Sequence, residues 1–303
     1  TSEISFRAEK SSIEYTGNSE VNIIDWYTYD VTTYTDEISH INEDNLIGAK
    51  AALSYHIPNG LIYLSASRGY KAGGINQNPF LSDLNRTYSD ESNLNFEIGL
   101  KNFSDKQNSQ LTAFYMNREN QQVNISSQQE TGNPNSFYYY TANAATGYNY
   151  GAEFENLIYF NKYLQLSTGL GYLKTWVNPY EFKTDESTSI SLGNREQSHS
   201  PMYTFSSSLS FTHKSGLKLN IEISGKDKFY FSDSHNEISD SYHILNLSMH
   251  YIIGSTSIQI WGKNVEDKRY AVRGFHFGLE PPYYEDKLYV QWADPFQMGI
   301  TLQ

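Results

Sequence analysis

The side chains best suited to binding a metal ion lie between positions 233 and 243. This segment contains Asp233, His235, Glu237, Asp240 and His243, and carboxylates and imidazoles are common ligands of divalent cations. The eight histidines of the chain nevertheless show no metal-ligand spacing on a common element. We therefore expect a solvated acidic loop here, and we predict no resident metal ion and no cofactor.

Catalytic residues are not indicated by any motif. The chain contains no cysteine, so a thiol nucleophile, a thiolate metal site and a disulfide are excluded. The pair Gly73-Gly74 and the spacing of Gly169 and Gly171 lack the strand-then-helix context of a phosphate-binding loop. No nucleophile turn marks a lipase or protease. We predict that the protein is not an enzyme.

Aromatic side chains form the other group with binding potential, and 26 of the 303 residues are tyrosine. Rigid aromatic faces can stack on catecholate, heterocyclic or sugar rings. Contact between loops, or with lipopolysaccharide, is the alternative explanation for any one of them. The aromatic residues that we predict as ligand contacts are Tyr138, Tyr139, Tyr140, Tyr283, Tyr284 and Trp292.

The elements that position these residues are predicted to be β-strands. Residues 217–223 place Leu219 and Ile221 on one face and Lys218 and Glu222 on the other, which is an alternation of period two. No run of residues approaches the roughly 18 to 20 apolar residues of a membrane helix. We predict about 12 strands, near residues 3–15, 45–56, 60–70, 92–103, 109–119, 147–160, 162–177, 203–213, 216–231, 242–253, 256–264 and 295–303.

The connections between these strands alternate between two kinds. Tight turns rich in Gly, Asn, Asp or Ser alternate with long connections at 16–44, 71–91, 120–146, 178–202, 232–241 and 265–294. Short turns at one end and long loops at the other are typical of an outer-membrane β-barrel. A soluble β-sandwich is the alternative, but its strands are shorter and its loops are not sorted by end.

The charges indicate which face of the strands meets lipid. On the strand at 216–231, one face carries Lys218, Glu222, Lys226 and Lys228, and a charge facing lipid costs roughly 2 to 4 kcal/mol near the midplane. The polar face is therefore expected to line the interior. Aromatic residues near strand ends, such as Tyr115, suit interfacial belts.

The net charge of −12 argues against nucleic-acid binding, which requires a basic face. The six long connections together carry −16, whereas the other segments carry +4, so the loop end is the acidic end. Residues 16–44 contain seven acids and no Lys or Arg. Such a field favours cationic or neutral ligands, although a single Arg on the inner wall could hold an anionic chelate.

Several segments resemble a known family. Residues 63–76, YLSASRGYKAGGIN, are similar to the strand-to-loop signature of TonB-dependent outer-membrane receptors. The stretches 92–102, 143–155 and 261–270 resemble barrel patterns of that family, and 294–302 resembles its last strand with Phe296 in place of an expected Arg. The resemblance implies a 22-stranded barrel, closed by an N-terminal plug, that uses TonB to import scarce nutrients across the outer membrane of a Gram-negative bacterium.

The resemblance also implies which parts lie outside residues 1–303. We find no plug domain and no TonB-contacting segment here, so we expect the chain to be the C-terminal transmembrane portion of the 22-stranded barrel. An autonomous 12-stranded barrel is the alternative. The expected partners are outer-membrane lipid and lipopolysaccharide, the plug and remaining strands in the same protein or another chain, TonB through the missing part, and a small-molecule metal chelate.

The expected function is energy-coupled import, most often of a ferric siderophore. Alternatives are a receptor for cobalamin or an oligosaccharide, a passive 12-stranded porin, and, with least support, an outer-membrane hydrolase. The family motif is expected at the extracellular rim, where Gly73 and Gly74 relax the loop and alternation turns Arg68 and Tyr70 outward toward lipopolysaccharide. The motif residues at this rim are Arg68, Gly69, Tyr70, Lys71, Gly73 and Gly74.

Overall fold

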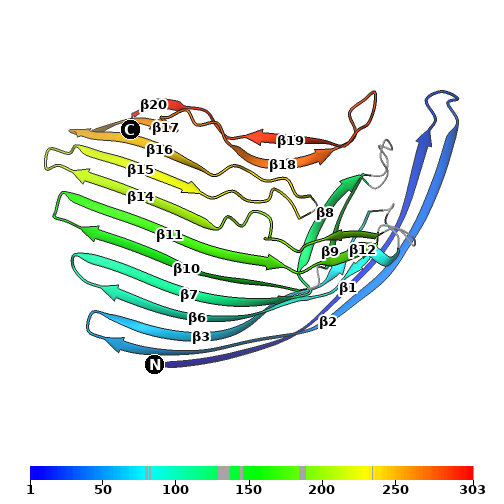
Figure 1. The fold of residues 1–303 in the computed structure, drawn as a ribbon, viewed down its shortest axis with the longest axis horizontal. Coiled ribbons are helices and arrows are strands. Elements are labelled where there is room, and N and C mark those ends of the chain that lie inside the picture. The colour runs from blue at the N-terminus through cyan, green and yellow to red at the C-terminus, as the bar shows by residue number, and fades with distance from the viewer. Residues whose placement is uncertain are drawn as a thin grey trace.

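The main element of the protein is one antiparallel sheet of 12 strands, paired in chain order (Figure 1). The computed structural model describes residues 1–78, 81, 83–128, 137–143, 146–183, 189–233 and 235–302. The strands of this sheet are β1 (Ser2–Ile24), β2 (Val31–Ile57), β3 (Gly60–Lys71), β6 (Glu91–Phe103), β7 (Gln107–Glu119), β10 (Thr146–Tyr159), β11 (Leu164–Val177), β14 (Tyr203–Thr212), β15 (Lys218–Lys226), β16 (Tyr242–Ile253), β17 (Thr256–Lys263) and β20 (Gln297–Leu302).

The predicted order of strands and connections is confirmed. Every strand pairs antiparallel with its chain neighbours, and β1 and β20 form the two edges of the curved sheet. Figure 1 shows the short turns together at one end and the long connections at the other, with both termini at the end of the short turns. The fold is therefore an all-β, antiparallel array of hairpins.

One predicted loop is largely wrong. The segment 16–44 is mostly strand, because β1 and β2 stay paired from Ser2 with Leu53 to Ile24 with Val31. The turn occupies only residues 25–30, where Asp25 Oδ1 accepts the backbone N–H of Tyr27 at 2.8 Å. A complete ladder of backbone hydrogen bonds overrides the turn-rich composition of this segment. The strand predicted at 216–231 is also shorter, since β15 ends at Lys226.

The long connections contain short hairpins of their own. These are β4 (Gly74–Ile75) with β5 (Thr87–Tyr88), β8 (Gln122–Gln128) with β9 (Phe137–Asn143), β12 (Tyr180–Lys183) with β13 (Ser189–Leu192), and β18 (Ala271–Phe277) with β19 (Lys287–Trp292). A single turn of 3-10 helix, η1 (Asp83–Asn85), precedes β5. Within the described residues, no helix has the length and apolarity needed to cross a membrane.

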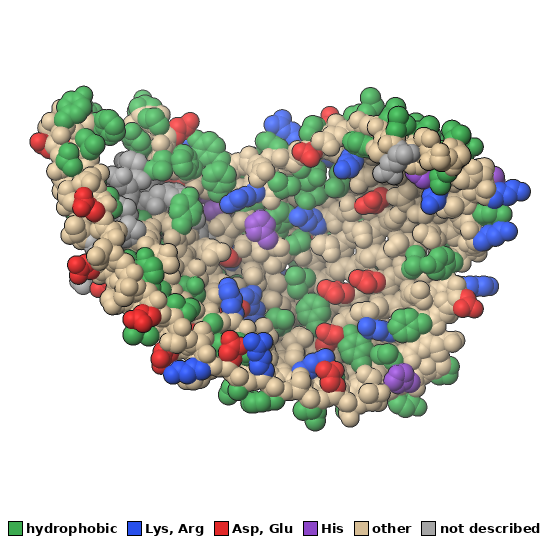
Figure 2. All heavy atoms as spheres, turned by 180° about the vertical axis from the view of Figure 1, so that it is seen from behind, with side chains coloured by type: hydrophobic (Ala, Val, Ile, Leu, Met, Phe, Trp, Pro, Cys, Tyr) green, Lys and Arg blue, Asp and Glu red, His purple; other side chains and the backbone are tan. Residues whose placement is uncertain are grey.

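The two faces of the sheet differ in chemistry. On β6, the side chains of Leu94, Phe96, Ile98 and Leu100 are 41–50% exposed on the outer face. On the inner face, Tyr63 donates its hydroxyl hydrogen bond to Glu97 at 2.5 Å. Figure 2 shows charged side chains distributed over the hollowed middle of the molecule. The apolar face is thus the exposed one, as expected for a surface that lipid covers.

Aromatic belts bound this apolar face. Tyr115, Tyr150 and Tyr203 are exposed toward the loop end, and Phe160 is exposed at the end of the short turns. Tyr150 and Phe160 are separated by ten residues, which corresponds to a rise of about 26 Å at ~3.4 Å per residue and a strand tilt of about 40°. This rise matches the apolar band of roughly 25 Å in such barrels.

Among the residues that the structure describes, the cluster of buried hydrophobic side chains lies where the long connections meet. Its buried members come from four different connections or strand ends: Leu81, Val123, Ile125, Tyr140, Val177 and Tyr180. Because these residues pack on each other, the loop hairpins form a structured layer at one end of the sheet.

We predict that single cysteines will report the facing of β15. Because the chain has no natural cysteine, Ile221→Cys should react with a lipid-phase label and Glu222→Cys with a water-soluble one. Labelling of the two variants in outer-membrane vesicles is the measurement. The reverse pattern would show that the charged face meets lipid.

Candidate functional site

A pocket of about 660 Å³ lies among the long connections at the loop end of the sheet. Its wall is built from six chain segments that are distant in sequence. The lining residues are Asn76, Asn124, Ile125, Tyr139, Tyr140, Thr141, Ser198, His199, Phe231, Ser232, Asp233, His235, Arg273, Gly274, Phe275 and His276.

One wall of the pocket is the β8–β9 hairpin. Tyr140 is buried in the loop core, whereas the neighbouring Tyr139 is 62% exposed. Asn76 holds this hairpin in place, since its amide donates to the carbonyl of Thr141 at 2.8 Å and its Oδ1 accepts the Thr141 N–H at 2.9 Å. Burial raises the pKa of the Tyr140 phenol, so this ring stays neutral.

The opposite wall combines the loop after β15 with strand β18. A Cβ at Gly274 would lie 2.5 Å from Cδ2 of Phe231, so only glycine lets the Phe231 ring pack directly against β18. Phe231 is buried, and its ring stands edge-on to that of Phe229, with centroids 5.7 Å apart. These contacts make an apolar wall opposite the tyrosines.

Two arginines set the charge of this wall. Arg273 lines the pocket, and among the described residues no acid lies within ion-pair distance of it. Arg195 lies behind the wall, where its Nη2 donates to the carbonyls of Ser232 at 2.7 Å and His235 at 3.1 Å. Arg195 therefore fixes the loop, and Arg273 is the cation available to a ligand.

His235 lines the pocket with a neutral ring. Its Nδ1 accepts the backbone N–H of Glu237 at 3.3 Å, so the neutral ring carries its proton on Nε2. That Nε2 is buried and has no hydrogen-bond partner among the described residues. Burial, with repulsion from His276, lowers the pKa of His235, so the ring is neutral at pH 7.

A second histidine completes this side of the pocket. The rings of His235 and His276 have centroids 4.8 Å apart, and His276 Nδ1 lies 3.0 Å from Oδ2 of Asp286. Asp233 accepts the backbone N–H of Ser198 at 3.2 Å. The pocket thus offers the Arg273 guanidinium to an anionic group, between aromatic walls.

The predicted aromatic contacts separate into two groups. Tyr139 and Tyr140 line the pocket, and Tyr138 packs against the adjoining core. The other three, Tyr283, Tyr284 and Trp292, lie outside its lining. Tyr283 is 72% exposed, and Arg269 lies over the Trp292 ring at 4.4 Å from its centroid.

The motif glycines have a different role from the one expected. Gly73 and Gly74 do not relax the loop, because a Cβ at either residue would lie 2.3 Å from an atom of Tyr88. The Gly73 N–H also donates to Asp44 Oδ2 at 2.9 Å. These residues pack the start of the loop tightly against β5.

The other motif residues surround the end of β3. Gly69 faces the side chain of Asn93, and Lys71 is exposed at the last position of the strand. Arg68 is exposed on the outer face, as expected. The Tyr70 ring instead lies over Gly48 and donates to Glu9 at 3.1 Å, so it does not point outward. The strands β2 and β3 part beyond Arg68, which lets this ring turn into the gap.

The acidic and histidine-rich segment does not gather into a metal site. His243 lies 3.1 Å from Glu266, and His235 faces the pocket. In the described part of the chain, no three His, Asp or Glu side chains are grouped so that they could hold a metal ion.

Several pocket residues were missed by the sequence analysis. Arg273, His199, Phe231 and Phe275 carry no local motif and come together only through the loop packing. The sequence signal nearest to the pocket was the cluster at 233–243, from which Asp233 and His235 line it.

The family follows from comparison with known proteins. Residues 16–265 match the model of the TonB dependent receptor-like β-barrel. The chain belongs to this family. The family is one of transport receptors, which agrees with the expectation that the protein is not an enzyme.

Solved structures of receptors share this fold. The chain is similar to the ferric yersiniabactin uptake receptor FyuA from Yersinia pestis (17% identity, TM-score 0.70, covering 99% of this chain and 42% of FyuA). It is also similar to the ferric-catecholate import receptor Fiu from Escherichia coli K12 (13% identity, TM-score 0.71, covering 99% of this chain and 41% of Fiu). A third similar structure is the copper transporter OprC (11% identity, TM-score 0.60, covering 88% of this chain and 40% of OprC). The chain spans about two fifths of the length of these proteins.

We predict that Gly274→Ala will loosen the wall of the pocket. The added Cβ would displace the Phe231 ring, and overpacking of this kind costs about 1–3 kcal/mol. The opening free energy of β18, measured by amide hydrogen exchange, should fall by that amount. Adding Phe231→Leu to Gly274→Ala should restore part of this opening free energy. If the losses in opening free energy of the two single variants simply add in the double variant, the proposed contact is contradicted.

We predict that acidification will open the loop around His235. The pKa of His235 is lower in the folded state than in the unfolded state, so folding favours the neutral ring. The loop therefore has its full stability above the unfolded pKa of about 6.5 and loses stability as the pH falls below that value. After correction for the intrinsic exchange rate, amide hydrogen exchange at Glu237 should become about three- to tenfold faster when the pH is lowered from 7.5 to 5.5. His235→Gln should remove this dependence; an unchanged dependence would assign it to another group.

Proposed function

We propose that this chain is part of an outer-membrane receptor of a Gram-negative bacterium that imports an anionic ferric chelate of the siderophore type. The observation that carries this proposal is the pocket that Arg273 lines together with the aromatic side chains of Tyr139, Tyr140 and Phe275. Aromatic rings can stack on the organic part of a chelate, and the guanidinium matches its negative charge.

The negative charge of the long connections makes Arg273 the position at which an anionic ligand is selected. The long connections are acidic overall, and residues 16–44 carry seven acids without a Lys or Arg. An anion is therefore repelled from most of this end of the molecule, and inside the pocket Arg273 offsets the charge of Asp233 and attracts it. A neutral sugar would gain little from this arrangement.

Energy-coupled import requires further structural parts besides the strands described here. In this proposal, the remaining strands close the barrel, an N-terminal plug blocks its lumen, and TonB acts on that plug. The partial coverage of FyuA and Fiu by this chain is consistent with such further parts. FyuA and Fiu are receptors for iron chelates, whereas OprC carries copper, so the neighbours support a metal-uptake role without fixing the metal.

We predict that two pocket residues will control chelate affinity. Tyr139→Ala removes an aromatic contact and Arg273→Ala removes the cation, and each should weaken binding by about 2 kcal/mol, or roughly 30-fold. Affinity should be measured with the purified full-length receptor against ferric catecholate, hydroxamate and carboxylate chelates.

Tyr283→Ala is the matched control, since this tyrosine is exposed outside the pocket. Its affinity should equal that of the natural protein. Unchanged affinity in both pocket variants would exclude this site. Tighter binding of a cobalamin or an oligosaccharide than of any chelate would favour another nutrient, and an open conductance in planar bilayers would favour a porin.

A further inference from the structure

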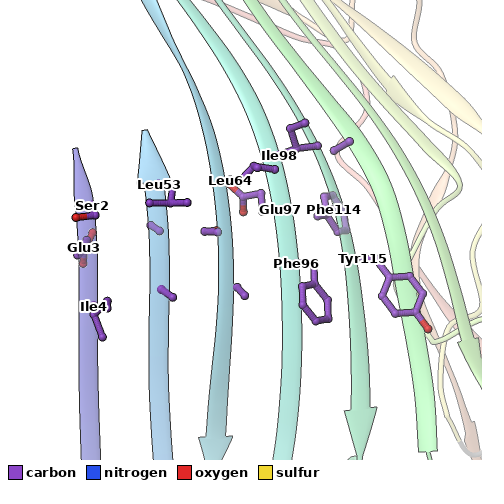
Figure 3. A pocket seen from close by; sticks show the side chains of 15 residues that line it. Ser2, Glu3, Ile4, Leu53, Leu64, Phe96, Glu97, Ile98, Phe114 and Tyr115 are labelled. Atoms are coloured by element: carbon purple, nitrogen blue, oxygen red, sulfur yellow. The ribbon is translucent and has the colours of Figure 1, made fainter. Parts of the chain in front are cut away.

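The hairpin of β1 and β2 changes the polarity of its outer face along its length. In the part nearest the short turns, this face carries Ile4 and Leu53, which line an apolar groove of the sheet (Figure 3). Beyond Ile47 the register continues unbroken, but the same face becomes mostly polar. Its acidic residues there are Glu14, Glu20, Glu37 and Glu43. Because charge is costly in lipid, this far part of the hairpin lies outside the membrane.

One edge of this far part has no strand beside it. β2 pairs with β3 only as far as Ala49 with Arg68, and the chain after β3 contacts Asp44 through the N–H of Gly73. Among the residues that the structure describes, no strand pairs with β2 on this side between Val31 and Ser39. This free edge is about 27 Å long at ~3.4 Å per residue. Figure 1 shows the hairpin extending past the other long connections.

Alternate residues of the free edge point their backbone groups away from β1. The Ile47 carbonyl faces this side, since it accepts a hydrogen bond from the Arg68 side chain. At the turn of the hairpin, the Asp25 N–H donates to the Asp30 carbonyl at 2.9 Å, so the even-numbered residues of β2 bond to β1. The outward N–H and C=O groups belong to the odd-numbered residues, which are Val31, Thr33, Thr35, Glu37 and Ser39.

The free edge lacks the usual devices that keep strand edges from pairing. Proteins protect such edges with Lys, Pro, a β-bulge or a covering segment. Residues 16–44 contain no Lys, Arg or Pro, and the pairing of β1 with β2 has no register shift. Residues 31–35, VTTYT, are exposed and are all of types that favour strands. The edge can therefore accept a further strand.

The charge and the aromatic rings around this edge define the strand that fits. Residues 16–44 carry seven acids, so a second copy of this chain is repelled and a strand rich in Lys or Arg is attracted. At the tip of the hairpin, Trp26, Tyr27 and Tyr29 are 75–97% exposed. The tip is held by Asp25, whose carbonyl accepts the Tyr29 N–H at 2.7 Å. Exposed aromatic faces attract cationic side chains.

We propose that the free edge of β2 and the aromatic tip form a docking site for an extended segment of another protein that is rich in Lys or Arg. The segment adds to β2 as a further strand. In such strand addition, backbone hydrogen bonds supply the affinity and the flanking side chains supply the specificity. This site depends neither on the Arg273 pocket nor on the identity of the imported ligand.

A labelled nine-residue peptide of alternating Lys and Thr, added to the full-length receptor in neutral detergent, tests this site. Fluorescence anisotropy gives its affinity. At saturating peptide, amide hydrogen exchange at Thr33, Thr35 and Glu37 should slow by about tenfold, because their outward N–H groups become hydrogen-bonded. A peptide of alternating Lys and Pro carries the same charge but pairs poorly as a strand, so it should bind about tenfold more weakly.

Two variants at one position separate the backbone from the side chain. Thr35→Pro removes an outward N–H and should weaken binding of the Lys–Thr peptide by about tenfold. Thr35→Ala keeps this N–H and should bind like the natural receptor. Natural protection of the Tyr34 amide, which faces β1, shows that the hairpin remains paired in Thr35→Pro.

Several results would overturn the proposal. These are no binding of the Lys–Thr peptide up to roughly 1 mM, equal binding of the Lys–Pro peptide, and equal affinity of Thr35→Pro and the natural receptor. Equal binding of a Glu–Thr peptide would show that charge does not select the partner. A receptor dimer that Thr35→Pro dissociates would assign the edge to a second copy instead.

Discussion

The desolvation of charge in lipid is the constraint on which the rest of this structure depends. In the middle of the main sheet, charged side chains lie on the inner face, because a charge near the midplane costs several kcal/mol. The exposed Ile98 and the hydrogen-bonded Glu97 on the same strand show the outcome. The same constraint leaves the outer face of the strands exposed, and in the described part of the chain the buried hydrophobic cluster lies where the long connections meet.

That packing at the loop end produces the candidate binding pocket. The hairpins of the long connections bury Tyr140 and Ile125 together, and this brings Arg273 and His235 to one pocket from distant parts of the chain. On the outer face, the same strands end at an aromatic belt, with Arg68 just beyond it.

Much of the fold could be predicted from the sequence, because period-two alternation and turn chemistry are local properties. The residues of the pocket could not, since Arg273, Phe231 and Tyr139 meet only through the packing of separate loops. The motif at Gly73 and Gly74 was recognised, but its function is close packing against Tyr88, which depends on a partner 14 to 15 residues away. The extended β1–β2 hairpin was missed because cross-strand pairing outweighed its turn-rich composition.

If this barrel takes part in energy-coupled uptake of a ferric chelate, iron should enter cells through the receptor only when TonB is present. Uptake of radiolabelled iron, supplied as the chelate that binds most tightly, should be measured in cells that produce the full-length receptor with or without TonB. We expect saturable uptake that requires both the receptor and TonB. Equal uptake in cells lacking TonB, rising linearly with chelate concentration, would contradict it.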